Sequence, residues 1–167
     1  MRLVRALLGG TAGAVLVWII VYVTGRASHS HADLCMLLGT SLTGNEDLWA
    51  WVAGAVAQLA LGMVAAVVYA AIFEWVTRRA GALAGFVVSL PHAVVAGIAV
   101  GFLPAQRLLD AGVGPPGAFL EYGGVAVMAA FVVAHLVFGT LVGALYRHPR
   151  HPAAEPGAVW RNVYNGS

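Results

Sequence analysis

The sequence alternates four long apolar stretches with shorter segments that carry most of its polar residues. Each stretch is long enough, at a rise of ~1.5 Å per helical residue, to cross a bilayer core. The pattern predicts an all-α polytopic membrane protein, a four-transmembrane-helix bundle in one domain (residues 1–148) with a polar cytoplasmic tail (residues 149–167). The predicted spans cover residues 3–24, 48–77, 80–103 and 122–146.

The segments between the spans add detail to this prediction. In the first loop, Leu34, Leu37 and Leu38 are spaced for a short helix lying at the membrane surface. The second and third spans are separated by only about three residues, so they must form an antiparallel hairpin. Trp49, Trp51 and Trp75 flank the second span, where aromatic side chains prefer the membrane interface.

Small residues recur at every fourth position along three of the spans. Such ridges allow helices to approach closely in a membrane, where packing drives association. Gln58 interrupts the ridge of the second span, and we expect its amide to hydrogen-bond another helix. The predicted helix-packing positions are Gly54, Gln58, Gly62, Gly81, Gly85, Ser89, Ala93, Gly97, Gly101, Gly139 and Gly143.

Composition supports membrane residence and narrows the function. The chain of 167 residues is 60% hydrophobic and only 10% charged, far below the ~25% of soluble domains. A net charge of +2 with dispersed basic residues argues against nucleic-acid binding. The single cysteine, Cys35, excludes an intrachain disulfide.

The arginines predict the orientation, because cytoplasmic segments of membrane proteins are enriched in positive charge. Arg26 and Arg107 fall on one side of the predicted bundle, and the other arginines fall on the opposite side. We therefore expect both termini in the cytoplasm and a location in the bacterial inner membrane. The arginines on the predicted cytoplasmic side are Arg2, Arg5, Arg78, Arg79, Arg147, Arg150 and Arg161.

Two histidines fall inside the spans, and the third span also contains a proline. Counted from the predicted cytoplasmic face, His92 and His135 reach nearly the same depth, close to the bilayer midplane. Ionisable residues at such depth are costly and are candidates for function. Two such rings would suit the axial ligands of a b-type haem, or a proton or quinone site. The simplest interpretation is structural, with each neutral ring hydrogen-bonded to a neighbouring helix.

A second candidate site lies in the first loop. His29, His31, Asp33 and Cys35 alternate along it and carry donors that bind copper or zinc. The spacing lacks the close pairing of a zinc knuckle, so the metal hypothesis is weak. No catalytic triad, phosphate loop or paired intramembrane carboxylates are visible in the sequence, and we expect no enzymatic activity.

Several short stretches resemble small four-span bacterial inner-membrane proteins of unknown function, the YagU-like proteins. The similar residues are Ala32 to Gly39 in the first loop, and His135 to Gly139 with Gly143 and Tyr146 in the last span. The resemblance implies the four-span fold and no particular reaction. Related sequences carry a histidine in the second span, where this chain has Gln58, and this departure argues against a shared metal or haem site.

Three functions follow as expectations. The first is a non-enzymatic accessory subunit without a cofactor, which packs against other membrane subunits or copies of itself through a spare small-residue ridge. The second is a haem- or quinone-linked electron carrier that uses His92 and His135. The third is a small transporter or proton path around Pro91, His92 and Gln58.

Overall fold

The computed structural model describes residues 2–30 and 32–146, and the predicted tail and His31 lie outside these residues. The described chain is all-helical, as predicted, and contains no strand. Four helices are long and apolar enough to cross a membrane, which makes the chain a multi-pass membrane protein. These are α1 (Leu3–Ala27), α3 (Leu48–Ala71, continued by the π-helical η1, Ile72–Val76), α4 (Ala82–Gly101) and α6 (Val125–Tyr146). The shorter elements are α2 (Leu34–Thr43), α5 (Ala105–Asp110) and the 3₁₀-helix η2 (Ala118–Gly123).

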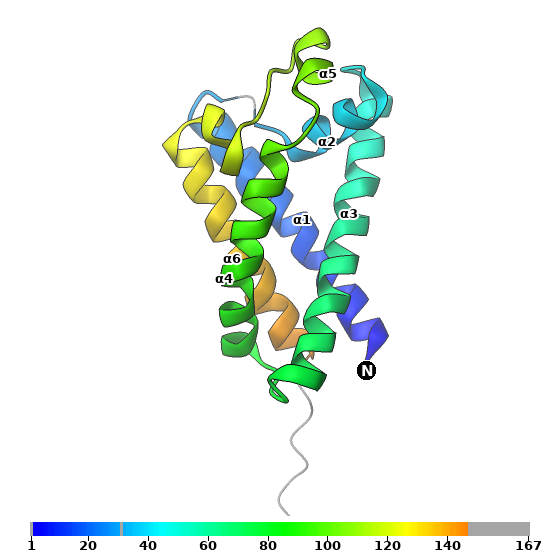
Figure 1. Ribbon diagram of the computed structural model, residues 1–167, viewed down its shortest axis with the longest axis vertical. Helices are drawn as coiled ribbons and strands as arrows, with labels where there is room; N and C mark the ends of the chain where they lie inside the picture. Colours follow the sequence, from blue (N-terminus) through cyan, green and yellow to red (C-terminus); the bar gives the residue numbers. More distant parts are fainter. Residues whose placement is uncertain (1, 31, 147–167) are drawn as a thin grey trace, which may run out of the picture.

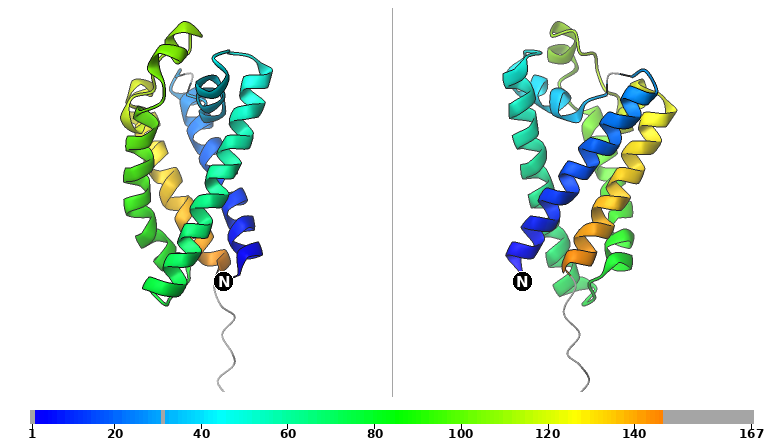
Figure 2. Two further views of the ribbon diagram at one scale, coloured as in Figure 1. Left: turned by 45° about the vertical axis from the view of Figure 1, so that its right-hand side comes forward. Right: turned by 180° about the vertical axis from the view of Figure 1, so that it is seen from behind.

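The long helices form an open arc in which α1 packs against α3 and α6, and α6 packs against α4. The two ends of the arc, α3 and α4, are joined by a short loop but have little contact along their lengths. Figure 1 shows them converging at the end where α1 begins and α6 ends, which we call the terminal end. The elements α2, α5 and η2 gather at the opposite loop end (Figures 1 and 2).

The closest contact between two of the long helices is that of α4 with α6. A Cβ atom added to Gly85 would overlap the carbonyl oxygen of Gly139, and one added to Gly139 would lie 2.6 Å from the carbonyl oxygen of Gly85. Ser89 is fully buried beside them, and a Cβ on Gly143 would lie 2.8 Å from the Cα of Gly85. Only glycine permits backbones to approach this closely.

The other small residues also pack within the chain. Farther along α4, Gly97 lies under the ring of Phe119, and Gly101 lies against Ala118. On α3, Gly62 meets α1 at Gly10, where an added Cβ would lie 2.5 Å from the Gly62 carbonyl oxygen. Gly54 meets α2, and its added Cβ would overlap the carbonyl oxygen of Cys35.

Asp33 organises the loop end. Its carboxylate caps α2 by accepting from the backbone amides of Cys35 (2.9 Å) and Met36 (3.3 Å). It also accepts from the indole nitrogens of Trp18 in α1 (3.0 Å) and Trp51 in α3 (3.1 Å). One carboxylate thus connects three helices.

These contacts add detail to two predictions about the loop end. Trp51 is half-buried and bonded to Asp33, whereas Trp49 and Trp75 are each 76% exposed, as interfacial residues should be. The helix α2 forms where expected but packs against α3, with Leu34 and Leu37 buried. Asp33 connects the two features, because its carboxylate accepts from both the α2 N-terminus and the Trp51 indole.

Tyr146 ties the terminal end together. Its hydroxyl accepts a hydrogen bond from the backbone amide of Arg2 (3.0 Å) and donates one to the carboxylate of Glu74 in η1. The start of α1, the end of α3 and the end of α6 therefore meet at one phenol, which is itself fully buried.

Candidate functional site

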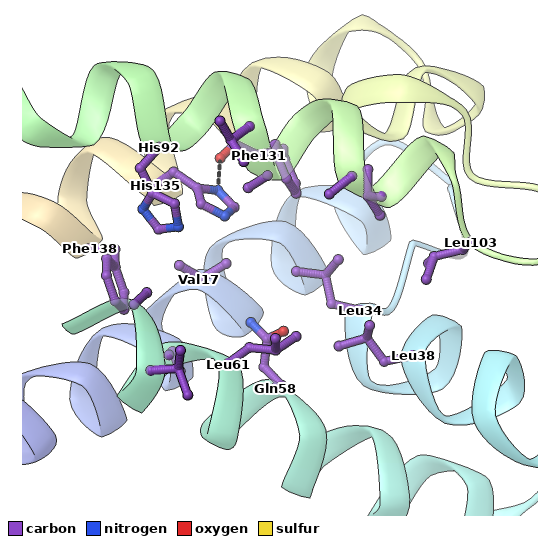
Figure 3. Close-up of a pocket in the computed structure, with 18 residues that line it drawn as sticks. Val17, Leu34, Leu38, Gln58, Leu61, His92, Leu103, Phe131, His135 and Phe138 are labelled. Carbon is purple, nitrogen blue, oxygen red and sulfur yellow. Dashed lines mark hydrogen bonds between the residues drawn. The ribbon is translucent and has the colours of Figure 1, made fainter. Parts of the chain in front are cut away.

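A cavity of about 400 Å³ occupies the space between α3 and α4 (Figure 3). All four long helices and α2 contribute to its walls, and no Asp, Glu, Lys or Arg is among its lining residues. The volume lies within the range of sites that hold small organic molecules, and a mostly apolar lining with a few polar groups is typical of them.

The cavity opens sideways toward the bilayer. Leu61 and Val64 of α3 and Val95 of α4 line it, yet they are 57%, 63% and 65% exposed. They lie near the middle of their spans, so the opening between them faces the hydrocarbon core. Toward the loop end, Leu34 and Leu38 of α2 close the cavity (Figure 3). A ligand from the bilayer would therefore enter between α3 and α4.

Two imidazole rings form the polar part of one wall. The rings of His92 and His135 lie edge to face with their centroids 5.3 Å apart, and the sequence prediction of equal depth agrees with this contact. The Nδ1 atom of His92 lies 3.0 Å from the hydroxyl oxygen of Tyr69 in α3. The Nδ1 atom of His135 lies 2.8 Å from the backbone carbonyl oxygen of Phe131, one turn earlier in α6.

Gln58 of α3 lines the same cavity as these rings (Figure 3). Its amide makes no hydrogen bond within the described part of the chain, so the expected bond to another helix is absent there. The cavity explains this difference, because α4 is too far from α3 at this level to offer a partner. An amide at mid-depth in a membrane that lacks a partner in the protein is available to a ligand.

The two histidines do not fit one haem. Axial ligation of a single iron requires both rings to point a nitrogen at the metal across a flat macrocycle, whereas these rings touch edge to face. Of the small residues of α4 and α6 that could make room for a macrocycle, Gly85, Ser89 and Gly139 are occupied by the α4–α6 contact, and only Ala96 lines the cavity. Phe131 covers His135 at a centroid distance of 4.2 Å.

The loop-end residues proposed for a metal are engaged elsewhere. Asp33 uses its carboxylate on the α2 cap and two indoles, and Cys35 is only 4% exposed. Burial, with the nearby charge of Asp33, raises the pKa of the Cys35 thiol to about 12, so it does not supply a thiolate at neutral pH. Within residues 2–30 and 32–146, no three His, Cys, Asp or Glu side chains are grouped for a metal. A metal site that includes His31 stays a prediction.

Three lining or supporting residues were not singled out from the sequence. Tyr69 is 2% exposed and holds His92, while Phe131 and Phe138 flank the two rings. Tyr69 did carry a signal, since its hydroxyl is one of the few polar groups within a mostly apolar span. The two phenylalanines did not, because aromatic residues are common throughout membrane helices.

No protein-family model, curated protein or solved structure matches this chain. The resemblance to YagU-like proteins stays a prediction.

Proposed function

We propose that this membrane protein binds a small lipophilic molecule that enters the cavity laterally from the bilayer. The observation that carries the proposal is the Gln58 amide, which lacks a hydrogen-bond partner in the described chain and lines the same apolar cavity as His92 and His135. Polar groups inside a membrane domain mark ligand or ion pathways. The apolar walls and the lateral opening favour a ligand that is dissolved in the bilayer.

The accessory-subunit function has less support. Its physical basis was a spare ridge of small residues, and the glycines of α3, α4 and α6 pack against other parts of this chain. The arginine distribution still favours the bacterial inner membrane with both termini in the cytoplasm. It places the loop end, with α2, on the opposite side.

The proposal is tested by filling the cavity. Ala65 of α3 lines it, whereas Val68, one turn away, is 52% exposed and does not. The wild type, Ala65→Phe and Val68→Phe would be purified in mild detergent from their native membranes, and the bound small molecules would be extracted and identified by mass spectrometry. We expect one lipophilic species, enriched over the bulk lipids, in the wild type and Val68→Phe and its loss in Ala65→Phe. Equal lipid content in all three proteins would contradict the proposal.

A further inference from the structure

The hydrogen bonds of the two histidines determine what kind of polar group the cavity accepts. At mid-depth among apolar side chains, both rings are taken as neutral, because a charged ring there is costly. A neutral imidazole has one nitrogen that donates and one that accepts. The hydrogen-bond partner of each Nδ1 atom therefore determines whether the Nε2 atom of the same ring donates or accepts.

His135 presents an acceptor. The carbonyl oxygen of Phe131 can only accept, so the Nδ1 atom of His135 must donate to it over 2.8 Å. The Nε2 atom of a neutral ring is then left with a lone pair. In Figure 3 this nitrogen lies on the side of the ring away from Phe131, toward the cavity.

His92 presents a donor. Tyr69 is 2% exposed, and its hydroxyl has His92 as its hydrogen-bond partner within the described residues. If His92 donated to this oxygen, the phenolic proton would be buried without an acceptor, which is unfavourable. Tyr69 therefore donates to Nδ1, and the proton of His92 is on Nε2.

His92 thus offers a donor and His135 an acceptor, on two rings of the cavity wall whose centroids lie 5.3 Å apart. A hydroxyl group can accept from His92 and donate to His135 at once, whereas a ketone or quinone oxygen can only accept. Phe131 and Phe138 flank the two rings and provide edge and face contacts for an aromatic ring. Gln58 lies across the cavity for a second polar group.

We infer that the ligand is a hydroxylated aromatic lipophile, a phenol or hydroquinone with an apolar tail that leaves between Val64 and Val95. This inference rests on the proposed function and adds the chemistry of the headgroup. His135 and His92 contact the hydroxyl, and Tyr69 is a positioning residue that sets the tautomer of His92.

Three probes of similar size test the inference. 4-Decylphenol carries a donor and an acceptor, 4-decylacetophenone carries only a strong acceptor, and 4-decylanisole is the methyl ether of the phenol. Affinities would be measured by equilibrium binding to the full-length protein in nanodiscs. Ala65→Phe would define the background, because it fills the cavity.

In the wild type we expect the phenol to bind about tenfold more tightly than the anisole, with the acetophenone between them, since each buried hydrogen bond contributes a factor of up to about ten. His135→Phe should abolish the advantage of the phenol over the acetophenone while the anisole still binds. Tyr69→Phe should reduce the advantage of the acetophenone over the anisole by about twofold, because about half of the His92 rings would then carry the proton on Nδ1 and lack the donor on Nε2. A general loss of structure would lower all three affinities together and leave their ratios unchanged.

The outcomes separate the two proposals. Equal saturable binding of all three probes, removed by Ala65→Phe, would overturn the assigned headgroup and leave the cavity as a binding site. Ratios that do not respond to His135→Phe would overturn the role of that ring. Binding of no probe above the Ala65→Phe background would contradict the proposed function itself.

Discussion

The helix α4 packs closely against α6 on one face and stays apart from α3 on another. On one face of α4, Gly85 and Ser89 bring the backbone against Gly139 of α6. On another face, His92, Val95 and Ala96 border the cavity that separates α4 from α3. In a bilayer, apolar side chains gain little by leaving lipid for protein, so close packing decides which helices associate. The short loop makes α3 and α4 neighbours in sequence, and the glycines make α4 and α6 neighbours in space.

The largest effect on stability is expected from Gly85→Ala, which disrupts the close contact between α4 and α6. The added methyl group would overlap the Gly139 carbonyl oxygen, and neither backbone can move without separating the helices. We expect a loss of about 3 kcal/mol or more in the free energy of unfolding, at the upper end for overpacking. Unfolding in mixed detergent micelles, followed by circular dichroism, measures it. Val87→Ala, at a 55%-exposed position of α4, is the control, and equal effects of the two changes would disprove the close contact.

Asp33→Ala should come next, because it releases α2 from the loop end of the cavity. The change removes the α2 cap and leaves the indole nitrogens of Trp18 and Trp51 without their acceptor. A loss of about 2–3 kcal/mol is expected from the cap and the unpaired donors together.

The reactivity of the Cys35 thiol in α2 would detect the same release of α2 from the loop end. Its raised pKa, about 12 against 9.0 for an ordinary thiol, keeps the folded thiol protonated at pH 8. Because a folded thiol keeps its proton between these two values while an unfolded one loses it, stability falls as the pH rises above about 9. Maleimide labelling at pH 8 should be slow in the wild type and at least about tenfold faster in Asp33→Ala, which lowers the thiol pKa and exposes the sulfur. Rapid labelling of the wild type would contradict the buried position of Cys35.

Tyr146→Phe should have a smaller effect at the terminal end. It removes the hydroxyl that joins the Arg2 amide to the Glu74 carboxylate but keeps the ring, which packs against Phe73. We expect a loss of about 1–2 kcal/mol, as for a hydrogen bond to a charged group. Combining the change with Glu74→Gln would show whether the two groups act together, and fully additive effects would exclude the bond.

Gln58→Leu should have the smallest effect on stability. It tests the cavity between α3 and α4, where the two helices stay apart. Because the amide has no hydrogen-bond partner in the described chain, its removal should change the free energy of unfolding by less than about 0.5 kcal/mol. Detergent unfolding of the ligand-free protein measures the change. A loss above about 1 kcal/mol would mean that Gln58 bonds another helix, as the sequence alone suggested.

Much of the fold follows from the sequence, and the cavity only in part. Four apolar stretches predicted four spans, and counting residues from the arginines brought His92 and His135 to one depth. The ridge on α4 marked a packing face without indicating that α6 would occupy it, because small residues specify close approach and not the partner. Gln58 was expected either to hydrogen-bond another helix or to take part in a transport path, and the sequence did not indicate the separation of α3 from α4 that leaves its amide in a cavity. Tyr69 matters through its bond to His92, and a sequence alone does not reveal such a pairing.

Photolabelling tests the central claim, a binding cavity between α3 and α4, most directly. Decylbenzene carrying a diazirine would be irradiated with the full-length protein in nanodiscs, and the labelled peptides would be identified by mass spectrometry. We expect saturable labelling of residues 58–65 of α3 and 92–99 of α4, which excess unlabelled decylbenzene suppresses and Ala65→Phe removes. Unsaturable labelling spread over lipid-facing positions such as Val68 and Val87, with none at the cavity, would contradict it.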